Sequence, residues 1–412
     1  MEDKELYAAL LGIRYPWRVD KVALNIKKNR VDVWVKEVKG LTWKCPHCGE
    51  RGPLHDHAQE RSWRHLDTCQ CQTFIHCRLP RVNCPVHGAQ QVPAFWAEPG
   101  ARFTLAFEGR AIDTLQECNI TGSQRLLQAG WKEVWRLLER AVQRGLRRKE
   151  RRIPEVLSID EKSFAKRHKY ETLICDQQKG TVEYVVDDRT QESLEDYYSL
   201  FTEEECLSVK AVSMDMWEPY ILATREWLPR ADIVFDRFHV VRQVTEAVDK
   251  VRRQEHKLLQ EQGDETLKGT RHLWLSNEEN IPEWRQEEFA DLRKVELKTG
   301  RAWALKESLR PFWDYTYPKW AENFFNKWYY WATHSRLAPM VHAAKTLKNH
   351  LPNILTYFKH HITNAVAEGL NSKIQKVKQM ACGFRNREHY KTAIYFHCGG
   401  LDLYPRLKPY SL

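Results

Sequence analysis

VLSIDEKSF at residues 156–164 and VKAVSMDMWEPY at 209–220 are the stretches that decide the fold of this chain. Each begins as a short apolar run, typical of a buried strand, and continues into an aspartate. Three more segments have strand character: KYETLICD (169–176), TVEYVVD (181–187) and ADIVFD (231–236). The turn-like QQKG joins the first two of these, and helical segments at 193–201 and 219–228 separate the later strands. Three hairpin-joined strands followed by alternating helices and strands predict an α/β domain with a sheet of mixed strand order.

Three acidic residues stand out by their place in this pattern. Asp160 ends the first predicted strand, Asp215 ends the fourth, and Glu368 lies in a late helical segment, NAVAEGLNSKI (364–374). In an open sheet, residues at adjacent strand ends converge on one edge, and a helix packed there can supply a third acid. Three carboxylates around one pocket can hold two Mg2+ ions for phosphoryl transfer. A single strand-end aspartate is usually a polar terminus or a helix cap, so the repeated placement carries the prediction.

A fourth aspartate ends the fifth strand in the sequence Asp236-Arg-Phe-His239. We expect Asp236 beside the same edge, as a further acid or as a group that orients the others. We expect His239 to contact a phosphate or to hold a carboxylate. A helix cap followed by a buried histidine explains the same residues equally well. Glu161 neighbours Asp160, but the alternation of side chains along a strand predicts that it points to the opposite face.

The rest of the chain divides where the pattern changes. VDKVALNI (19–26) and VDVWVKEV (31–38) flank the turn-like KKNR and predict a β-hairpin. Residues 238–350 are predicted to be helical and are rich in tryptophan, and a last helical stretch begins near 360. We predict five regions: a hairpin and zinc-binding module (1–100), a helix-turn-helix module (101–153), a catalytic core (154–240), a helical insertion (241–355) and the C-terminal part of the core (356–412).

Two short motifs of the same form lie in the N-terminal region, Cys45-Pro-His-Cys48-Gly and Cys84-Pro-Val-His87-Gly. In each, two ligands separated by two residues can reach one ion, and the glycine permits a tight turn. They predict one structural zinc with four protein ligands, which leaves no open position for catalysis. Buried structural cysteines are the alternative, and histidines 55, 57, 65 and 76 are alternative ligands. Three other cysteines are expected to be packing thiols, with a second metal left open: Cys69, Cys71 and Cys77.

The sequence GSQRLLQAGWKEVWRLLERAVQRGLRRK (122–149) predicts a short helix, a turn at Ala129-Gly130 and a longer helix, which is the helix-turn-helix arrangement. Apolar residues recur every three or four positions on the second helix, and Trp131 and Trp135 are expected to face the core of the module. Between 121 and 153, ten Lys or Arg and three Asp or Glu give a net charge of +7. A solvated amphipathic helix is the plainer interpretation, but so one-sided a stripe favours contact with DNA. The stripe consists of Lys132, Arg136, Arg140, Arg144 and Arg147.

The composition of the chain is typical of a protein that binds a polyanion. The 412 residues carry 65 Lys or Arg and 55 Asp or Glu, a formal net charge of +10, so nucleic acid is the expected partner. With 42% hydrophobic and 29% charged residues, the chain is globular rather than disordered. No apolar run approaches the roughly 18 residues of a membrane span, and the acidic start MEDKELYAALLGI is not expected to be a signal peptide. Eleven cysteines in such a chain favour reduced thiols or metal ligands in a cytosol.

In the motifs described above, the chain resembles bacterial insertion-sequence transposases of the ISL3 family. These are acid-triad (DDE) enzymes with a ribonuclease-H-like catalytic fold. The resemblance covers nearly the whole chain. It rests on CPHCG, CPVHG, GWKEVWRL, SIDEKSF, VSMDMWEPY, ADIVFDRFHVVRQVTEAVDKVRR (231–253) and AEGLNSKIQKVKQMACGFRNREHY (367–390). One departure is His87, which closes the second zinc motif where a cysteine is commoner in the family.

The resemblance implies a function and residues for it. The catalytic acids of the family fall on Asp160, Asp215 and Glu368, which would bind two Mg2+ or Mn2+ ions, while the zinc stays structural. The N-terminal modules would bind the terminal inverted repeats of the mobile element, and the core would cleave DNA with water and join the freed 3′-OH to target DNA. Two-ended synapsis implies at least a homodimer on double-stranded DNA, in the bacterial cytoplasm with the nucleoid. Three residues are expected around the acids, orienting them: Asp236, His239 and Asn371.

Two other functions fit the same residues. A ribonuclease-H-like nuclease would cut DNA without joining it, and the dedicated N-terminal modules and the helical insertion favour transposition over this alternative. A domesticated regulator would bind DNA without catalysis. Acids at all three expected positions count against a regulator, because a silenced enzyme has no need to keep them.

Overall fold

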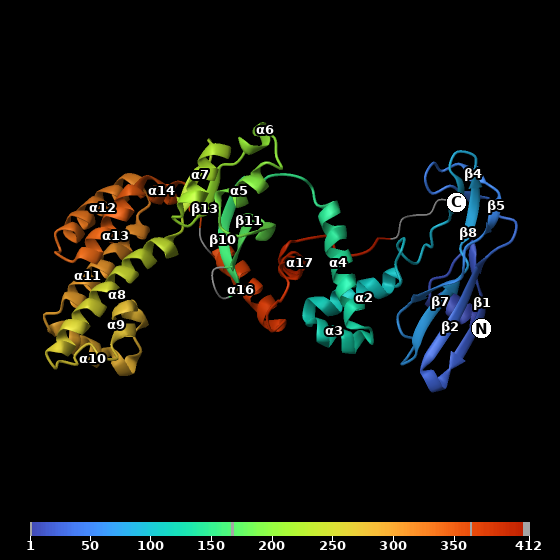
Figure 1. Ribbon diagram of the computed structural model, residues 1–412, viewed down its shortest axis with the longest axis horizontal. Coiled ribbons are helices and arrows are strands. Elements are labelled where there is room, and N and C mark those ends of the chain that lie inside the picture. Colours follow the sequence, from blue (N-terminus) through green and yellow to red (C-terminus); the bar gives the residue numbers. More distant parts are fainter. Residues whose placement is uncertain (1, 166–168, 363–364, 407–412) are drawn as a thin grey trace. The chain divides into compact units, whose positions relative to one another are not determined.

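The computed structural model describes residues 2–165, 169–362 and 365–406 (Figure 1). The chain forms two compact units: Met1–Lys149 together with Val377–Leu412, here called the first unit, and Glu150–Lys376, the second unit. We expected 356–412 to form one region with the catalytic core. The structure instead divides that region within α16 (Ala365–Met380), whose last residues belong to the first unit.

The first unit begins with a β module. Its four-stranded sheet has the order β1-β2-β7-β6, and the predicted hairpin is confirmed because β1 and β2 pair antiparallel. Alternate residues of β2 are buried, as its alternating sequence requires. Four tryptophans belong to the core of the module: Trp17, Trp43, Trp63 and Trp96. The elements are α1 (Asp3–Leu10), β1 (Trp17–Asn25), β2 (Arg30–Glu37), β3 (Trp43–Lys44), β4 (Arg51–Gly52), β5 (Leu54–His57), β6 (Arg61–Arg64), β7 (Gln72–Cys77), β8 (Pro80–Cys84) and β9 (Gly88–Gln91).

Three helices follow the β module: α2 (Leu105–Glu117), α3 (Ile120–Leu127) and α4 (Trp131–Arg148). They confirm the predicted short helix, turn and longer helix. Gln128 ends α3 in the left-handed conformation with φ 47°, and Gly130 is the N-cap of α4. α17 (Arg387–Cys398) packs against α4, so residues from the end of the chain complete the core of these helices.

The second unit is built on one five-stranded sheet. Its strands are β10 (Val156–Ala165), β11 (Lys169–Asp176), β12 (Thr181–Asp187), β13 (Ala211–Met214) and β14 (Asp232–Phe235). Their order is β12-β11-β10-β13-β14, with antiparallel pairing from β12 to β10 and parallel pairing from β10 to β14. The predicted mixed sheet is therefore confirmed. All four residues of β13 are buried, as expected for a short apolar strand between parallel neighbours.

Helices account for the rest of the second unit, as predicted. α8 starts directly after β14 and packs against α11 and α13, and one continuous hydrophobic core extends from the sheet into these helices. The buried Glu255 of α8 accepts the N–H groups of Lys298 and Thr299, both at 2.7 Å, and so caps α11. Among the helices that the structure describes, none is long and apolar enough to cross a membrane. The helices are α5 (Gln191–Tyr198), α6 (Glu203–Cys206), α7 (Glu218–Trp227), α8 (Arg237–Glu261), α9 (Arg271–Leu275), α10 (Glu283–Lys294), α11 (Lys298–Leu309), α12 (Pro318–Thr333), α13 (Ala338–Asn349), α14 (Leu351–Leu355) and α15 (Tyr357–His360).

Candidate functional site

Three aspartates lie side by side at the carboxyl ends of the parallel strands in the second unit's sheet. β10 pairs with β13 in the register 158↔213, and β13 pairs with β14 in the register 214↔235. Asp160 and Asp215 each lie two residues beyond the first of these pairs. Asp215 and Asp236 each lie one residue beyond the second. Parallel strands therefore bring the three side chains to the same edge, as the sequence predicted. Asp160 does not end its strand, because β10 continues to Ala165 through its pairing with β11.

A cavity of about 410 Å3 opens at this edge, and we call it the acid cavity. Asp160, Glu161, Asp215 and His239 line it. His239 Nε2 lies 2.7 Å from Asp215 Oδ1 and 3.7 Å from Asp236 Oδ2. Asp236 also accepts the N–H of Phe238 at 2.7 Å and so caps α8. The predicted cap and the predicted carboxylate contact of the histidine are both present.

The charge of His239 follows from its neighbours. Burial opposes the charged form of the imidazole. The hydrogen bond to Asp215 and the negative charges of Asp215, Asp236 and Asp160 outweigh burial and raise the pKa of His239 above its ordinary value. The imidazole fixes one oxygen of Asp215, and its charged form is favoured by the aspartates around it.

The late helix α16 reaches the same edge through Asn371. Its side-chain amide donates to Asp160 Oδ2. Glu368 lies three residues earlier on the same helix, so the two side chains project from neighbouring positions on one side of it. Glu368 is exposed and, in the described part of the chain, is not among the residues that line the acid cavity. The structure thus brings together Asp160, Asp215, Asp236, His239 and Asn371, with Glu368 one helical turn away.

Glu161 was expected on the opposite face of the sheet from Asp160, and the regular pairing of β10 with β11 through both residues agrees with this alternation. Its side chain lines the acid cavity and is 13% exposed. β10 runs past the last pair with β13, so Glu161 stands at an open edge, where the acid cavity is lined by Glu161 as well as Asp160. Burial raises the pKa of Glu161 to about 7, and the charges of Asp215 and Asp160 add to this rise while Arg189 counteracts it.

Sequence reasoning missed Arg189 and Trp217, which also line the acid cavity. The guanidinium of Arg189 lies 4.0 Å from the ring centre of Trp217, and its Nε lies 2.8 Å from Glu161 Oε1. The contact joins the loop before α5 to the loop after β13. The position of Trp217 at the cavity could have been predicted, because it follows Asp215 by two residues. No pattern in the sequence points to Arg189.

The predicted zinc ligands meet in the first unit. The ligand atoms of Cys45, Cys48, Cys84 and His87 all lie within 4.8 Å of one another. Cys48 Sγ is 3.5 Å from Cys84 Sγ, and His87 Nδ1 is 3.7 Å from Cys45 Sγ. The backbone N–H of His87 donates to Cys84 Sγ at 3.4 Å, and this bond is the main reason that the pKa of Cys84 falls to about 6. Three sulfurs and one imidazole around one point fit a tetrahedral zinc ion.

The other cysteines of this module differ among themselves. Cys77 is buried, and burial raises the pKa of its thiol, so it is the packing thiol that was predicted. Cys71 is partly buried against the same core. Cys69 is exposed, so the expectation of a packing thiol was wrong there. It lies in a tight turn between Thr68 and Cys71 with φ 56°, which directs it away from the core.

The predicted basic stripe of α4 divides into exposed and buried members. Lys132, Arg136 and Arg147 are exposed. Arg144 is only 4% exposed, which contradicts its assignment as a DNA contact. Residues four apart on an α-helix rotate by about 40° at each step, so the stripe turns from solvent at Lys132 toward the core at Arg144.

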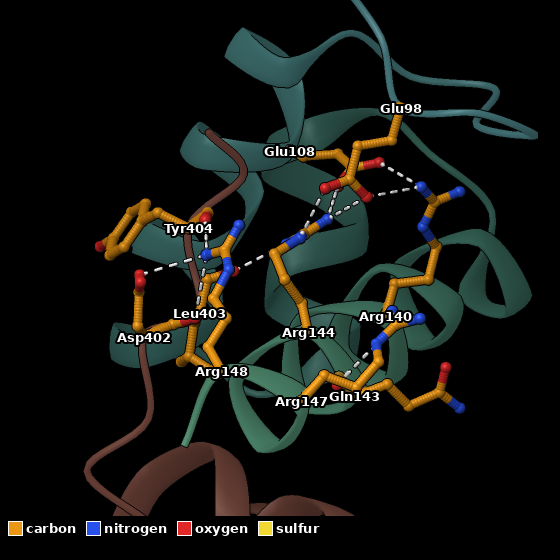
Figure 2. Close-up of polar contacts among 10 residues, drawn as sticks. All are labelled: Glu98, Glu108, Arg140, Gln143, Arg144, Arg147, Arg148, Asp402, Leu403 and Tyr404. Atoms are coloured by element: carbon orange, nitrogen blue, oxygen red, sulfur yellow. Dashed lines mark hydrogen bonds and ion pairs between the residues drawn. The ribbon is translucent and has the colours of Figure 1, made fainter. Parts of the chain in front are cut away.

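Figure 2 shows how this buried arginine is balanced, in a group of four residues that we call the Arg144 cluster: Glu98, Glu108, Arg140 and Arg144. Arg144 Nη2 is 2.8 Å from Glu98 Oε2 and 2.5 Å from Glu108 Oε2, and Nη1 donates to the Leu403 carbonyl at 2.7 Å. Arg140 Nη2 lies 3.0 Å from Glu98 Oε2. Burial opposes the charge of Arg144, but its contacts with the two acids outweigh burial and raise its pKa.

The two tryptophans of α4 also differ. Trp135 is buried in the core of the helices, as expected. Trp131 is 44% exposed, so the prediction that it faces the core was wrong. It stacks on Trp135 at the first turn of the helix, with ring centres 5.9 Å apart.

Comparison with protein families matches three successive parts of the chain. A family model described as "Transposase" matches residues 157–394, which include Asp160, Asp215 and Glu368. A model of the zinc-finger of transposase IS204/IS1001/IS1096/IS1165 matches residues 41–87 and so includes the four predicted zinc ligands. A model of the helix-turn-helix domain of transposase family ISL3 matches residues 90–142.

Individual relatives agree with these matches. The transposase for insertion sequence element IS1001 of Bordetella parapertussis is 27% identical over 350 residues, which cover 84% of this chain and 86% of that protein. The transposase for insertion sequence element IS1557 of Mycobacterium tuberculosis is 26% identical over 423 residues, covering 94% of this chain and 93% of that protein. These relatives are similar to the present chain over nearly their full lengths.

Proposed function

We propose, from the premise that this chain belongs to the ISL3 family of transposases, that it binds the terminal inverted repeats of its own insertion sequence, cleaves the DNA there and joins the freed ends to target DNA. The observation that carries the proposal is the placement of three aspartates at one edge of the sheet, with His239 2.7 Å from one of them. A strand order of three antiparallel strands followed by two parallel ones supports the ribonuclease-H-like fold expected of such an enzyme.

The acid cavity fits hard divalent cations, because carboxylate oxygens dominate its edge. Asp160, Asp215 and Glu368 would hold Mg2+ or Mn2+, which supplies activation of the attacking hydroxyl and stabilisation of the leaving oxygen. The chain's own groups fix the geometry. His239 holds one oxygen of Asp215, Asn371 donates to Asp160 Oδ2, and the backbone N–H of Glu161 donates to Asp160 Oδ1 at 2.6 Å, so these groups orient both aspartates.

Glu368 joins the acids in this proposal through its helix. Asn371 anchors α16 to Asp160, and Glu368 projects from the turn before it, on the same side. We expect the exposed Glu368 side chain to turn toward ions held by the two aspartates and to supply the third carboxylate.

The first unit supplies the recognition of DNA in this proposal. The exposed Lys132, Arg136 and Arg147 of α4 contact the inverted repeat, while Arg144 shapes the module from inside. The zinc held by the four predicted ligands is structural, because its coordination is complete without water. Since two ends of the element meet in one reaction, we expect at least a homodimer on DNA.

A plasmid joining assay tests this function. Protein, Mg2+ and supercoiled DNA that carries the element's two ends should yield cleaved ends and joined products. Asp215→Asn should yield neither, while a gel-shift measurement shows that it still binds the repeat. Cleavage without joining would favour the nuclease alternative, and cleavage by Asp215→Asn would overturn the assignment of the acids.

A further inference from the structure

Arg189 brings a positive charge to the acid cavity, and its neighbours hold it in place. Its side chain is 31% exposed and lines the acid cavity, while Nε itself is buried. Glu161 Oε1 lies 2.8 Å from Nε, and the guanidinium carbon lies over the ring of Trp217, 4.0 Å from the ring centre. Because the carboxylate and the ring restrict the side chain, it is ordered before any ligand arrives.

The backbone completes this arrangement. The indole N–H of Trp217 donates to the carbonyl of Arg189 at 3.2 Å. Each residue thus holds the other, the arginine through its backbone and the tryptophan through its ring. Trp217 follows Asp215 by two residues, so the contact ties Arg189 to the loop that carries a proposed catalytic acid.

The chemistry of the group points to a phosphate. A guanidinium has five N–H donors in one plane, and the contact with Glu161 uses the Nε side, which leaves the terminal NH2 groups for a second acceptor. Two such groups match two oxygens of a phosphodiester. A DNA strand that enters a cavity of carboxylates is repelled, and a fixed cation beside them reduces that repulsion. Little rotamer freedom remains to be lost on binding, because the ring already holds the side chain.

The alternative is an arginine that only balances Glu161. The Arg144 cluster shows what such a group looks like in this protein, because Arg144 is buried, faces two carboxylates and donates to a carbonyl. Arg189 differs from Arg144 in its exposure and in its surroundings. It is partly exposed, and it faces a cavity large enough to admit part of a nucleotide.

We propose that Arg189 binds a phosphate of the DNA strand that is cut, beside the phosphodiester that reacts, with Trp217 as the surface on which the guanidinium is held. This inference rests on the proposed function, since it names a further contact of the same substrate.

The test removes the charge of the arginine and the charge of single phosphates, first separately and then together. Cleavage of the element's end is measured for the parent protein and for Arg189→Ala, on DNA that carries one neutral methylphosphonate at each position flanking the cut in turn. On unmodified DNA, Arg189→Ala should slow cleavage by roughly ten- to a hundredfold, the loss expected for one charged hydrogen-bonded contact. At one position the methylphosphonate should slow the parent protein similarly and add little to the loss of Arg189→Ala.

Two further variants separate the contact from folding. Arg189→Lys keeps the charge without the planar pair of donors and should recover only part of the rate. Arg293→Ala is the matched control, because Arg293 also pairs with a carboxylate, Glu278 at 2.8 Å, and lies 5.4 Å from the ring centre of a tryptophan, Trp303, but in the helical region outside the acid cavity. It should cleave as the parent does.

Three results would overturn the inference. One is parent-like cleavage by Arg189→Ala. Another is a methylphosphonate penalty that is the same in both proteins at every position. The third is equal loss in Arg293→Ala, which would mean that the effect is structural. If the parent protein does not cut the ends at all, the proposed function fails and this inference fails with it, whereas parent cleavage with an indifferent Arg189 refutes the inference alone.

Discussion

The Arg144 cluster and the acid cavity are both groups of charged side chains, but they are built in opposite ways. In the Arg144 cluster two guanidiniums face two carboxylates, and Arg144 and Glu108 are buried (Figure 2). In the acid cavity carboxylates of neighbouring strands face one another across a space open to ligand. A cluster that is closed and balanced contributes to folding, whereas one that is open and unbalanced requires a cation for its function.

The four zinc ligands sharpen the comparison, because in this third cluster a bound zinc ion, not an opposite side chain, would balance the thiolates. Cys84→Ser, or removal of the metal by a chelator, should unfold the β module, since structural zinc contributes an apparent 10–16 kcal/mol, an order-of-magnitude figure, in small zinc domains. Metal analysis together with circular dichroism measures the effect. Cys69→Ser is the matched control, because this cysteine of the same module is exposed and outside the ligand set. Protein purified without chelator that contains no zinc would contradict the prediction.

An acid removed from the open cavity should affect activity and stability in opposite directions. Asp160→Asn should reduce cleavage below detection, because a neutral amide is a poor ligand for the proposed ions. Its free energy of unfolding should be unchanged to within about 0.5 kcal/mol or should rise, since the repulsion from Asp215 and Glu161 is relieved while the contact with Asn371 can persist. Thermal unfolding beside the cleavage assay measures both. A clear loss of stability would show that the cavity is a structural cluster after all.

In the Arg144 cluster, the loss of a charged side chain should lower the stability of the first unit. Arg144→Met leaves the buried Glu108 with the longer 3.5 Å contact to Arg140 as its remaining ion pair among the described residues. Breaking a buried pair in this way costs about 3–5 kcal/mol. Hydrogen exchange of the α4 amides measures the loss in the first unit. Arg147→Met is the control on the same helix, because that side chain is exposed and, among the described residues, its hydrogen bond goes to the Gln143 carbonyl. Equal loss in the two variants would contradict the structural role of the cluster.

The smallest expected effect concerns an exposed arginine that belongs to neither cluster. Arg136→Ala should weaken binding of the inverted repeat and lower the dependence of binding on salt by about one phosphate contact, with little change in stability. A salt series with native and scrambled repeats measures this. A weakening that is uniform across both DNAs indicates a phosphate contact, and one confined to the native repeat indicates a base contact. Binding identical to that of the parent would remove Arg136 from the DNA interface.

Elements and sites that depend on local sequence were predictable. The strands of the second unit follow from short apolar runs, and their mixed order follows from hairpins before helices. The zinc ligands follow from two motifs in which the ligands and their turn occupy five consecutive residues. The convergence of Asp160 and Asp215 was also predicted, because parallel strands place their ends at one edge whatever the sequence between them.

Features that depend on where a regular pattern stops were not predictable. Glu161 enters the acid cavity because β13 ends beside it, and the end of a neighbouring strand is not visible in the alternation of β10. Arg144 is buried because a stripe spaced by four residues drifts around the helix, a drift that counting charges does not reveal. Arg189 meets Trp217 through two loops, and such loop contacts have no period in the sequence.

The division of α16 between the two units has a consequence for the order in which the protein is made. The chain passes from the first unit to the second near residue 150 and returns near residue 377, so the second unit is inserted within the first. A ribosome therefore completes the whole second unit before it makes α17 and Leu403, which cover α4 and satisfy Arg144. Gly145 receives Leu401 so closely that an added Cβ would lie 2.6 Å from the leucine Cβ, so this late docking leaves no room for a side chain. The helix proposed to read DNA acquires its final surroundings only after the residues proposed to cut DNA have been synthesised.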